Sequence, residues 1–119
     1  MKKLFILVLC FICFSGCSSK EDNGLISYME AKEMIINDGA ILIDVRTEDE
    51  YNEKHIDGSV LLTLDTIDEE KALSVIASKD TPIIVYCQSG NRSGQALSKL
   101  EALGYTEVYD LGSINNWKE

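Results

Sequence analysis

Short apolar runs alternate with helical segments along this chain, and this alternation restricts the possible folds more than any other feature of the sequence. The apolar runs occupy residues 41–45, 60–62, 83–86 and 108–109. Strands that alternate with helices form parallel sheets, whose two faces are covered and whose strands therefore contain nearly continuous apolar runs. The sequence predicts an α/β domain with a central, mostly parallel sheet and helices on both faces.

Three helix starts carry the capping-box pattern, in which a hydroxyl side chain precedes a glutamate by three residues. The first of these helices is expected to end near Gly39, which can adopt the left-handed conformation of a helix C-cap. A last helix, with apolar residues at helical spacing from Ser93 onward, is expected to end at Gly104 for the same reason. The capping-box pairs are Ser27 with Glu30, Thr47 with Glu50, and Thr66 with Glu69.

The candidate site is the segment in which the third apolar run ends at Cys87 and a polar loop leads into the last helix. Pro82 blocks helix before this run, so Cys87 falls at the C-terminal end of a strand. A loop that closes onto a helix N-terminus directs unpaired backbone N–H groups toward its interior. These groups, with Arg92 nearby, favour a reactive thiolate. The alternative, a buried structural cysteine, leaves the polar loop and its arginine unexplained.

The segment from Cys87 to Ser93 resembles the active-site loop of single-domain rhodanese-like sulfurtransferases. Other motifs occur in the order and at about the spacing of that family, over residues 26–118. The sequence departs from the family's pattern at Ser59, where alanine is common, and at Ser113, where a second glycine is common. The matching motifs are Asp44-Val45-Arg46, Glu50-Tyr51, His55-Ile56-Asp57-Gly58-Ser59, Gly104-Tyr105, and Leu111-Gly112 before Trp117.

The resemblance implies a rhodanese-like fold with a five-stranded, mostly parallel sheet. It also implies that Cys87 takes a sulfane sulfur from thiosulfate or a persulfide and passes it to a thiol or to cyanide. Asp44 and Arg46 are expected to support the rim of the site, where Arg46 also has the spacing of an i,i+4 ion pair with Glu50. His55 is expected to serve the fold rather than catalysis. The expected substrate-binding residues are Gln88, Ser89, Gly90, Asn91, Arg92 and Ser93.

Two other functions stay open on the residues alone. A binding or redox-sensing module with this fold would dock a partner at a membrane and leave Cys87 without a catalytic role. Arsenate or phosphate chemistry also uses a cysteine loop closed by arginine, but one residue fewer separates Cys87 from Arg92 than in the cysteine phosphatases. One histidine and one cysteine in the domain do not form a zinc site, so neither a metal nor another cofactor is predicted.

The N-terminus has the features of a bacterial lipoprotein signal peptide. Lys2 and Lys3 precede an apolar run over residues 4–14, which is shorter than the about 20 residues of a transmembrane helix. A small-residue pair then precedes Cys17 as in a lipobox, so Cys17 is expected to carry lipid; a plain cleaved signal is the alternative. We therefore expect a signal peptide in residues 1–16, a lipidated tether in 17–24, and the rhodanese-like domain in 25–119, anchored to the extracytoplasmic face of a membrane.

The net charge and the cysteine content of the chain restrict the kinds of partner that the domain is expected to bind. The formal net charge of −9 at pH 7 argues against nucleic acid as a partner. Cys10 and Cys13 belong to the signal peptide and Cys17 to the lipid anchor, so Cys87 has no disulfide partner. Because exported domains favour disulfides, a lone thiol there suggests a chemical role. Residues 25–119 are enough to form one hydrophobic core, and the domain is expected to be a monomer.

Overall fold

A parallel sheet of four strands forms the centre of the domain in the computed structural model, which describes residues 24–118. The strands lie in the order β2-β1-β3-β4, and each neighbouring pair is parallel. The predicted parallel sheet is therefore confirmed. Its strands are β1 (Ile41–Asp44), β2 (Val60–Leu61), β3 (Ile83–Cys87) and β4 (Val108–Ser113).

The expected five strands are not found, because residues 24–118 contain four. In the place of a fifth strand, Leu25 forms an isolated parallel bridge with Asp110 of β4. Asp110 accepts from the Ile26 N–H at 3.0 Å and donates to Gly24 O at 2.8 Å. Ser27 then caps a helix, and helix formation ends the pairing with β4.

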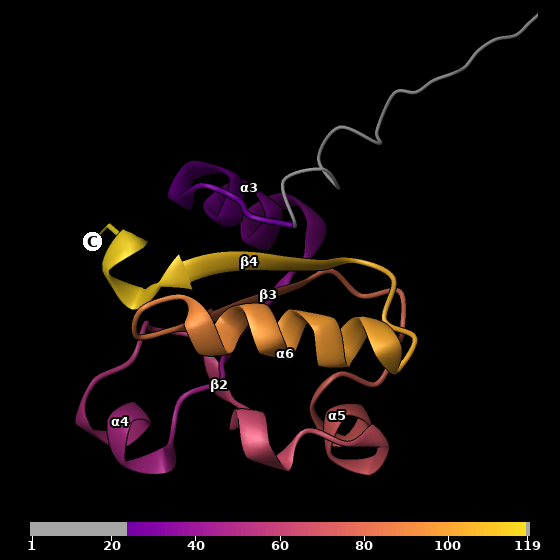
Figure 1. The fold of residues 1–119 in the computed structure, drawn as a ribbon. Coiled ribbons are helices and arrows are strands. Elements are labelled where there is room, and N and C mark those ends of the chain that lie inside the picture. Colours follow the sequence, from indigo (N-terminus) through magenta and orange to yellow (C-terminus); the bar gives the residue numbers. More distant parts are fainter. Residues whose placement is uncertain (1–23, 119) are drawn as a thin grey trace, which may run out of the picture.

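Helices cover both faces of the sheet (Figure 1). Helix α3 lies on one face, and α5 and α6 lie on the other. Alternate residues of β3 accordingly enter two apolar clusters, with Ile83 and Val85 on the α6 side and Ile84 and Tyr86 on the α3 side. The helices are α3 (Tyr28–Asp38), α4 (Glu48–Glu53), α5 (Glu69–Val75) and α6 (Asn91–Ala102), with 3₁₀ turns η3 (Leu64–Thr66) and η4 (Ile114–Asn116).

Two of the three predicted capping boxes are confirmed, those at Ser27 and Thr47. The third is wrong, because Asp68 caps α5 by accepting a hydrogen bond from the Lys71 N–H at 2.8 Å. Thr66 instead ends η3, where its hydroxyl donates to Thr63 O at 2.7 Å. Aspartate caps helices at least as well as threonine, so the later residue sets the start of α5.

The two predicted glycine helix ends are confirmed. Gly39 has φ 71° directly after α3, and Gly104 has φ 102° just beyond α6. Within residues 24–118, no helix is long and apolar enough to cross a membrane. The predicted signal peptide and Cys17 lie outside the described residues.

Candidate active site

Cys87 closes β3, and its sulfur faces the N-terminus of α6. The backbone N–H groups of Gly90 and Ser93 donate to Cys87 Sγ at 2.9 and 3.2 Å. The Ser93 hydroxyl donates to Gly90 O at 3.1 Å, which holds the loop closed around the sulfur. The Ser93 N–H belongs to the first turn of α6, whose donors have no partner within the helix. Two backbone donors and the positive helix end are thus placed to stabilise negative charge on sulfur.

Gly90 adopts a backbone conformation that brings its N–H to the sulfur. Its φ is 101°, a region that residues with a side chain rarely enter. We expect Gly90→Ala to lower the free energy of unfolding by about 1–2 kcal/mol and to slow sulfur transfer, because alanine strains this turn. Urea denaturation and a transfer assay measure the two effects.

The matched control is Gly94→Ala in the same helix, where φ is not positive. Alanine there is expected to leave stability unchanged or raise it by up to about 1 kcal/mol, because glycine weakens helix interiors. Equal effects of the two substitutions on stability would contradict a special role for the Gly90 conformation.

The sulfur is closed off from solvent in this structure, with 0 % of Cys87 exposed. A reactive thiolate, as predicted from the sequence, has to be reached by a sulfur donor, so this complete burial differs from the expectation. Above it the loop side chains of Gln88 and Ser89 are exposed, and Gly90 is half-buried. The loop is tied to β4 by the Ser113 hydroxyl, which donates to Gln88 O at 2.7 Å. Access to the sulfur therefore requires this short loop to move.

The side chains of Gln88 and Asn91 form hydrogen bonds with residues other than Cys87. Gln88 Oε1 accepts from Arg46 Nη1 at 3.2 Å, and Asn91 Oδ1 accepts from Gln95 at 3.1 Å. Of the residues predicted to bind substrate, Gly90 and Ser93 contact Sγ, in both cases through the backbone. Ser113 was noted in the sequence only as a departure from the family's pattern, and its contact with the loop was missed.

Arg92 forms a two-pronged ion pair with Glu50 of α4. Its Nη1 and Nη2 donate to the Glu50 carboxylate at 2.8 and 3.1 Å. Glu50 Oε1 also accepts from the Thr47 N–H at 2.9 Å. The hydrogen bonds from Arg92 and then Thr47 lower the pKa of Glu50 to about 2, and Glu50 raises the pKa of Arg92. The suggested ion pair of Arg46 with Glu50 is wrong, because Glu50 pairs with Arg92 and Arg46 pairs with Asp44.

This ion pair predicts a pH dependence of stability. The pKa of Glu50 falls from 4.5 to about 2 on folding, so the ionised carboxylate is bound more strongly in the folded protein. Its contribution is complete above pH 4.5 and is lost as the pH falls toward 2. About a third of each side chain is exposed, so the effect is modest.

We expect Glu50→Gln to remove part of the stability that the wild-type protein loses in this pH window. Urea midpoints at neutral pH and within the window measure it for both proteins. Glu48→Gln, at an exposed position of the same helix, is the control and is expected to behave like wild type. If Glu50→Gln and wild type lose stability in parallel, the ion pair does not contribute.

Asp44 and Arg46 form a buried ion pair beside the loop. Asp44 ends β1 next to Tyr86 of β3, so the strands of Asp44 and Cys87 are neighbours, as the sequence suggested. Arg46 Nε and Nη2 donate to the Asp44 carboxylate at 3.0 and 2.7 Å, and Nη2 also donates to Lys54 O at 2.6 Å. The hydrogen bond to Asp44 raises the pKa of Arg46. Together with its bond to Gln88, Arg46 connects β1, the end of α4 and the loop.

His55 contributes to the fold, as the sequence predicted. Its Nδ1 lies 2.8 Å from Tyr51 O, and its ring stacks on the Tyr51 ring with centroids 3.8 Å apart. The residues that follow hold Tyr86, whose hydroxyl accepts from the Ile56 N–H at 3.1 Å and lies 3.0 Å from Ser59 Oγ. Burial raises the pKa of Tyr86 to about 12. This motif therefore anchors the strand that ends in Cys87.

A cavity of about 470 Å³ opens beside the loop. Its lining includes Arg46, Glu50, Lys54 and Gln88, so it carries charges of both signs. Among residues 24–118, no group of three or more histidine, cysteine, aspartate or glutamate side chains is placed to hold a metal ion. The cavity borders the loop through Gln88, the residue that follows Cys87.

Comparison with known proteins identifies the family. Residues 27–119 match the family described as rhodanese-like domain. The chain is 35 % identical over 94 residues to the thiosulfate sulfurtransferase GlpE of Coxiella burnetii, covering 78 % of this chain and 85 % of that protein. It is 36 % identical over 74 residues to the thiosulfate sulfurtransferase PspE of Escherichia coli, covering 62 % and 70 %.

Solved structures show the same fold. A rhodanese with anions from E. coli matches with a TM-score of 0.61 and 31 % identity, covering 65 % of this chain and 89 % of that one. The human single-domain sulfurtransferase TSTD1, at 21 % identity, matches with a TM-score of 0.66 over 79 % of this chain and 94 % of its own. The chain therefore belongs to the rhodanese-like family, among the sulfurtransferases of rhodanese type.

Proposed function

We propose that this protein transfers sulfane sulfur through a persulfide on Cys87, from thiosulfate or a persulfide to a thiol or cyanide. The observation that carries the proposal is the pair of backbone hydrogen bonds from Gly90 and Ser93 to Cys87 Sγ. They form at the end of a central strand, where ligands of open α/β sheets gather. A thiolate in this position has a preorganised environment for the negative charge that it carries before and after reaction.

The proposed transfer has two displacement steps. The Cys87 thiolate attacks the outer sulfur of the donor, an Sγ–S bond forms, and the donor's sulfur–sulfur bond breaks. The leaving group is sulfite when the donor is thiosulfate, and it is a thiolate when the donor is an organic persulfide. In the second step the acceptor attacks the outer sulfur, the Sγ–S bond breaks, and the Cys87 thiolate returns. A thiol acceptor, reacting as its thiolate, gives a persulfide, and cyanide gives thiocyanate.

The charges around the loop bear on the choice of donor. Both arginines near it are already paired, Arg92 with Glu50 and Arg46 with Asp44. Gln88, Ser89 and Asn91 add no charge, so the loop itself has no unpaired positive charge to attract a dianion. This supports a persulfide of low charge as donor, whereas the names of the relatives support thiosulfate. A comparison of the two donors at low and high salt distinguishes them, because only attraction of a charged donor weakens with salt.

The first step can be tested alone by omitting the acceptor. Mixing the protein with thiosulfate is expected to release sulfite in a burst of about one equivalent per protein, after which release stops. An organic persulfide is expected to release its thiolate in the same proportion. Absence of a burst with both donors, in protein of intact fold, contradicts sulfur transfer.

A second candidate is a binding or redox-sensing module, and the complete burial of Cys87 favours it. The rate of alkylation of Cys87 by iodoacetamide separates the two. A donor-accessible sulfur is expected to react within minutes in the folded protein. A sulfur that reacts only on global unfolding supports the module. Arsenate or phosphate chemistry has no such support, because the Arg92 guanidinium is bound by Glu50.

We propose as well that Cys17 is lipidated and anchors the protein to the extracytoplasmic face of a bacterial membrane. The apolar run of residues 4–14 and the Ser15-Gly16 pair before Cys17 support this. Expression in bacteria with a labelled fatty acid is expected to label the wild-type protein and move it to the membrane fraction. Cys17→Ser is expected to remove both, and a labelled Cys17→Ser protein would contradict the assignment.

A further inference from the structure

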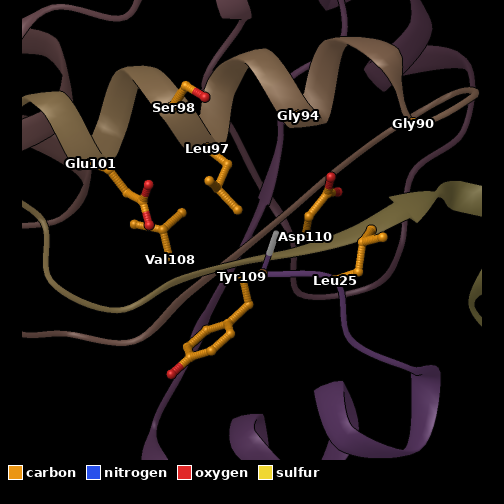
Figure 2. A pocket seen from close by; sticks show the side chains of 10 residues that line it. Leu25, Gly90, Gly94, Leu97, Ser98, Glu101, Val108, Tyr109 and Asp110 are labelled. Atoms are coloured by element: carbon orange, nitrogen blue, oxygen red, sulfur yellow. The ribbon is translucent and has the colours of Figure 1, made fainter. Parts of the chain in front are cut away.

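A second cavity, of about 600 Å³, lies between α6 and β4 (Figure 2). Figure 2 shows Asp110 pointing from β4 toward α6 at Gly94, and Leu97 and Val108 lying between Asp110 and Glu101. Its volume falls in the range of about 300–1,000 Å³ that small-molecule sites occupy.

Asp110 is a buried carboxylate in the wall of this cavity, with 5 % of the residue exposed. Its Oδ1 accepts from the Gly112 N–H at 2.7 Å. The Ser93 hydroxyl is the other hydrogen-bond donor to this carboxylate among residues 24–118. Burial raises the pKa of Asp110, although the hydrogen bonds from Ser93 and Gly112 lower it. The Ser93 hydroxyl is shared, because it also donates to Gly90 O at 3.1 Å. An ionised carboxylate has about four acceptor positions, so this buried group can still accept hydrogen bonds from a ligand in the cavity.

The chemistry of the cavity wall selects a cation with an apolar part. Glu101 and Asp110 are the ionisable carboxylates that line it, and no lysine, arginine or histidine of residues 24–118 does. Leu25, Leu97 and Val108 supply apolar surface. A metal ion needs more ligands than this wall has, because residues 24–118 hold no metal-binding group of three such side chains. A primary ammonium is compact and offers three N–H donors, which suits one carboxylate oxygen.

Gly94 keeps the space in front of Asp110 open. A methyl group at this position would lie 3.9 Å from Asp110 Oδ2, in van der Waals contact and without a clash. Gly94 is helical, so its backbone does not require glycine, and glycine weakens a helix interior. The space beside the carboxylate is therefore a second observation that favours a ligand.

We propose that this cavity binds a small organic amine, whose ammonium group lies against Asp110 and whose apolar part packs on Leu97 and Val108. The site is separate from the Cys87 sulfur and goes beyond sulfur transfer. The two sites share Gly90, which lines the cavity and donates its N–H to Cys87 Sγ. A bound amine therefore lies against the loop that holds the sulfur.

Titration of the isotope-labelled protein with n-butylammonium chloride, followed by amide NMR, tests the site. We expect saturable shifts at Gly94 and Gly112, and no such shifts with n-butanol or with sodium chloride at equal ionic strength. Asp110→Asn keeps the shape and removes the charge, and is expected to weaken binding at least tenfold. Cys87→Ser is expected to bind as wild type does, which separates this site from sulfur transfer.

Gly94→Ala keeps the charge and fills the space, and is also expected to weaken binding at least tenfold. Because alanine favours helix, this variant is expected to be folded, which circular dichroism checks. Absence of saturable shifts at Gly94 and Gly112 in the wild-type protein overturns the proposal. Equal affinity in wild type and Asp110→Asn overturns it as well.

Discussion

Replacing Cys87 with serine is expected to lower kcat/KM for sulfur transfer at least about 10³-fold, because a hydroxyl is a far weaker nucleophile than a thiolate and cannot carry a persulfide. Thiocyanate formation from thiosulfate and cyanide measures the loss. Serine is smaller than cysteine and can accept the same N–H bonds from Gly90 and Ser93, so the fold is expected to remain.

The control for this substitution is Ser74→Ala on the exposed side of α5, far along the chain from the loop. Its activity is expected to equal that of wild type. Retention of more than about a tenth of wild-type activity in Cys87→Ser would falsify the assignment of Cys87 as the nucleophile, because no serine could supply it.

Replacing Arg46 with alanine is expected to lower the free energy of unfolding by about 3–5 kcal/mol. Asp44 is 0 % exposed and Arg46 4 %, so the substitution leaves a carboxylate buried without its main partner. It also removes the hydrogen bonds to Lys54 O and to Gln88. Urea denaturation at neutral pH measures the stability. Arg46→Lys keeps the positive charge but loses the planar set of N–H donors, so its stability is expected to lie between those of wild type and Arg46→Ala.

An exposed ion pair supplies the comparison for the buried one. Lys79 and Glu69 lie 3.2 Å apart, with 33 % and 56 % of their side chains exposed. Glu69→Gln is expected to change stability by less than about 1 kcal/mol. If Arg46→Ala costs no more than Glu69→Gln, the Asp44–Arg46 pair does not support the rim of the site.

The sequence predicted those parts of the structure that local patterns determine. Continuous apolar runs predicted the parallel strands, and capping residues predicted the bounds of α3 and the start of α4. The position of Cys87 between a strand and a helix N-terminus predicted backbone donors at its sulfur. Each of these follows from residues close together in the chain, where spacing is informative.

Contacts between distant segments were not predictable in the same way. Glu50 lies four residues from Arg46, yet it binds Arg92 across the site, which helical spacing does not reveal. Within residues 24–118, the place of the expected fifth strand holds one bridge, between Leu25 and Asp110, and Ser27 caps a helix directly after it. The hydrogen bond from Ser113 to Gln88 O likewise joins β4 to the loop from a distant position in the chain.

Asp110 was also not singled out from the sequence. A lone aspartate in a short strand pattern reads as a solvent-facing residue of an edge strand. The register of β4 against β3 shifts after Asp110, where Val85 pairs with Asp110 but Tyr86 pairs with Gly112. This irregularity and the glycine at position 94 bury the carboxylate beside an open space, and neither follows from a single-residue pattern.

The mass of the Cys87 peptide, after purification without reductant and exposure to a sulfane donor, tests the central claim most directly. We predict that Cys87 gains the mass of one sulfur atom, and that cyanide removes this mass and yields an equal amount of thiocyanate. Unmodified Cys87 after exposure to both thiosulfate and an organic persulfide, in protein whose thiol still reacts with iodoacetamide, would contradict sulfur transfer through this residue.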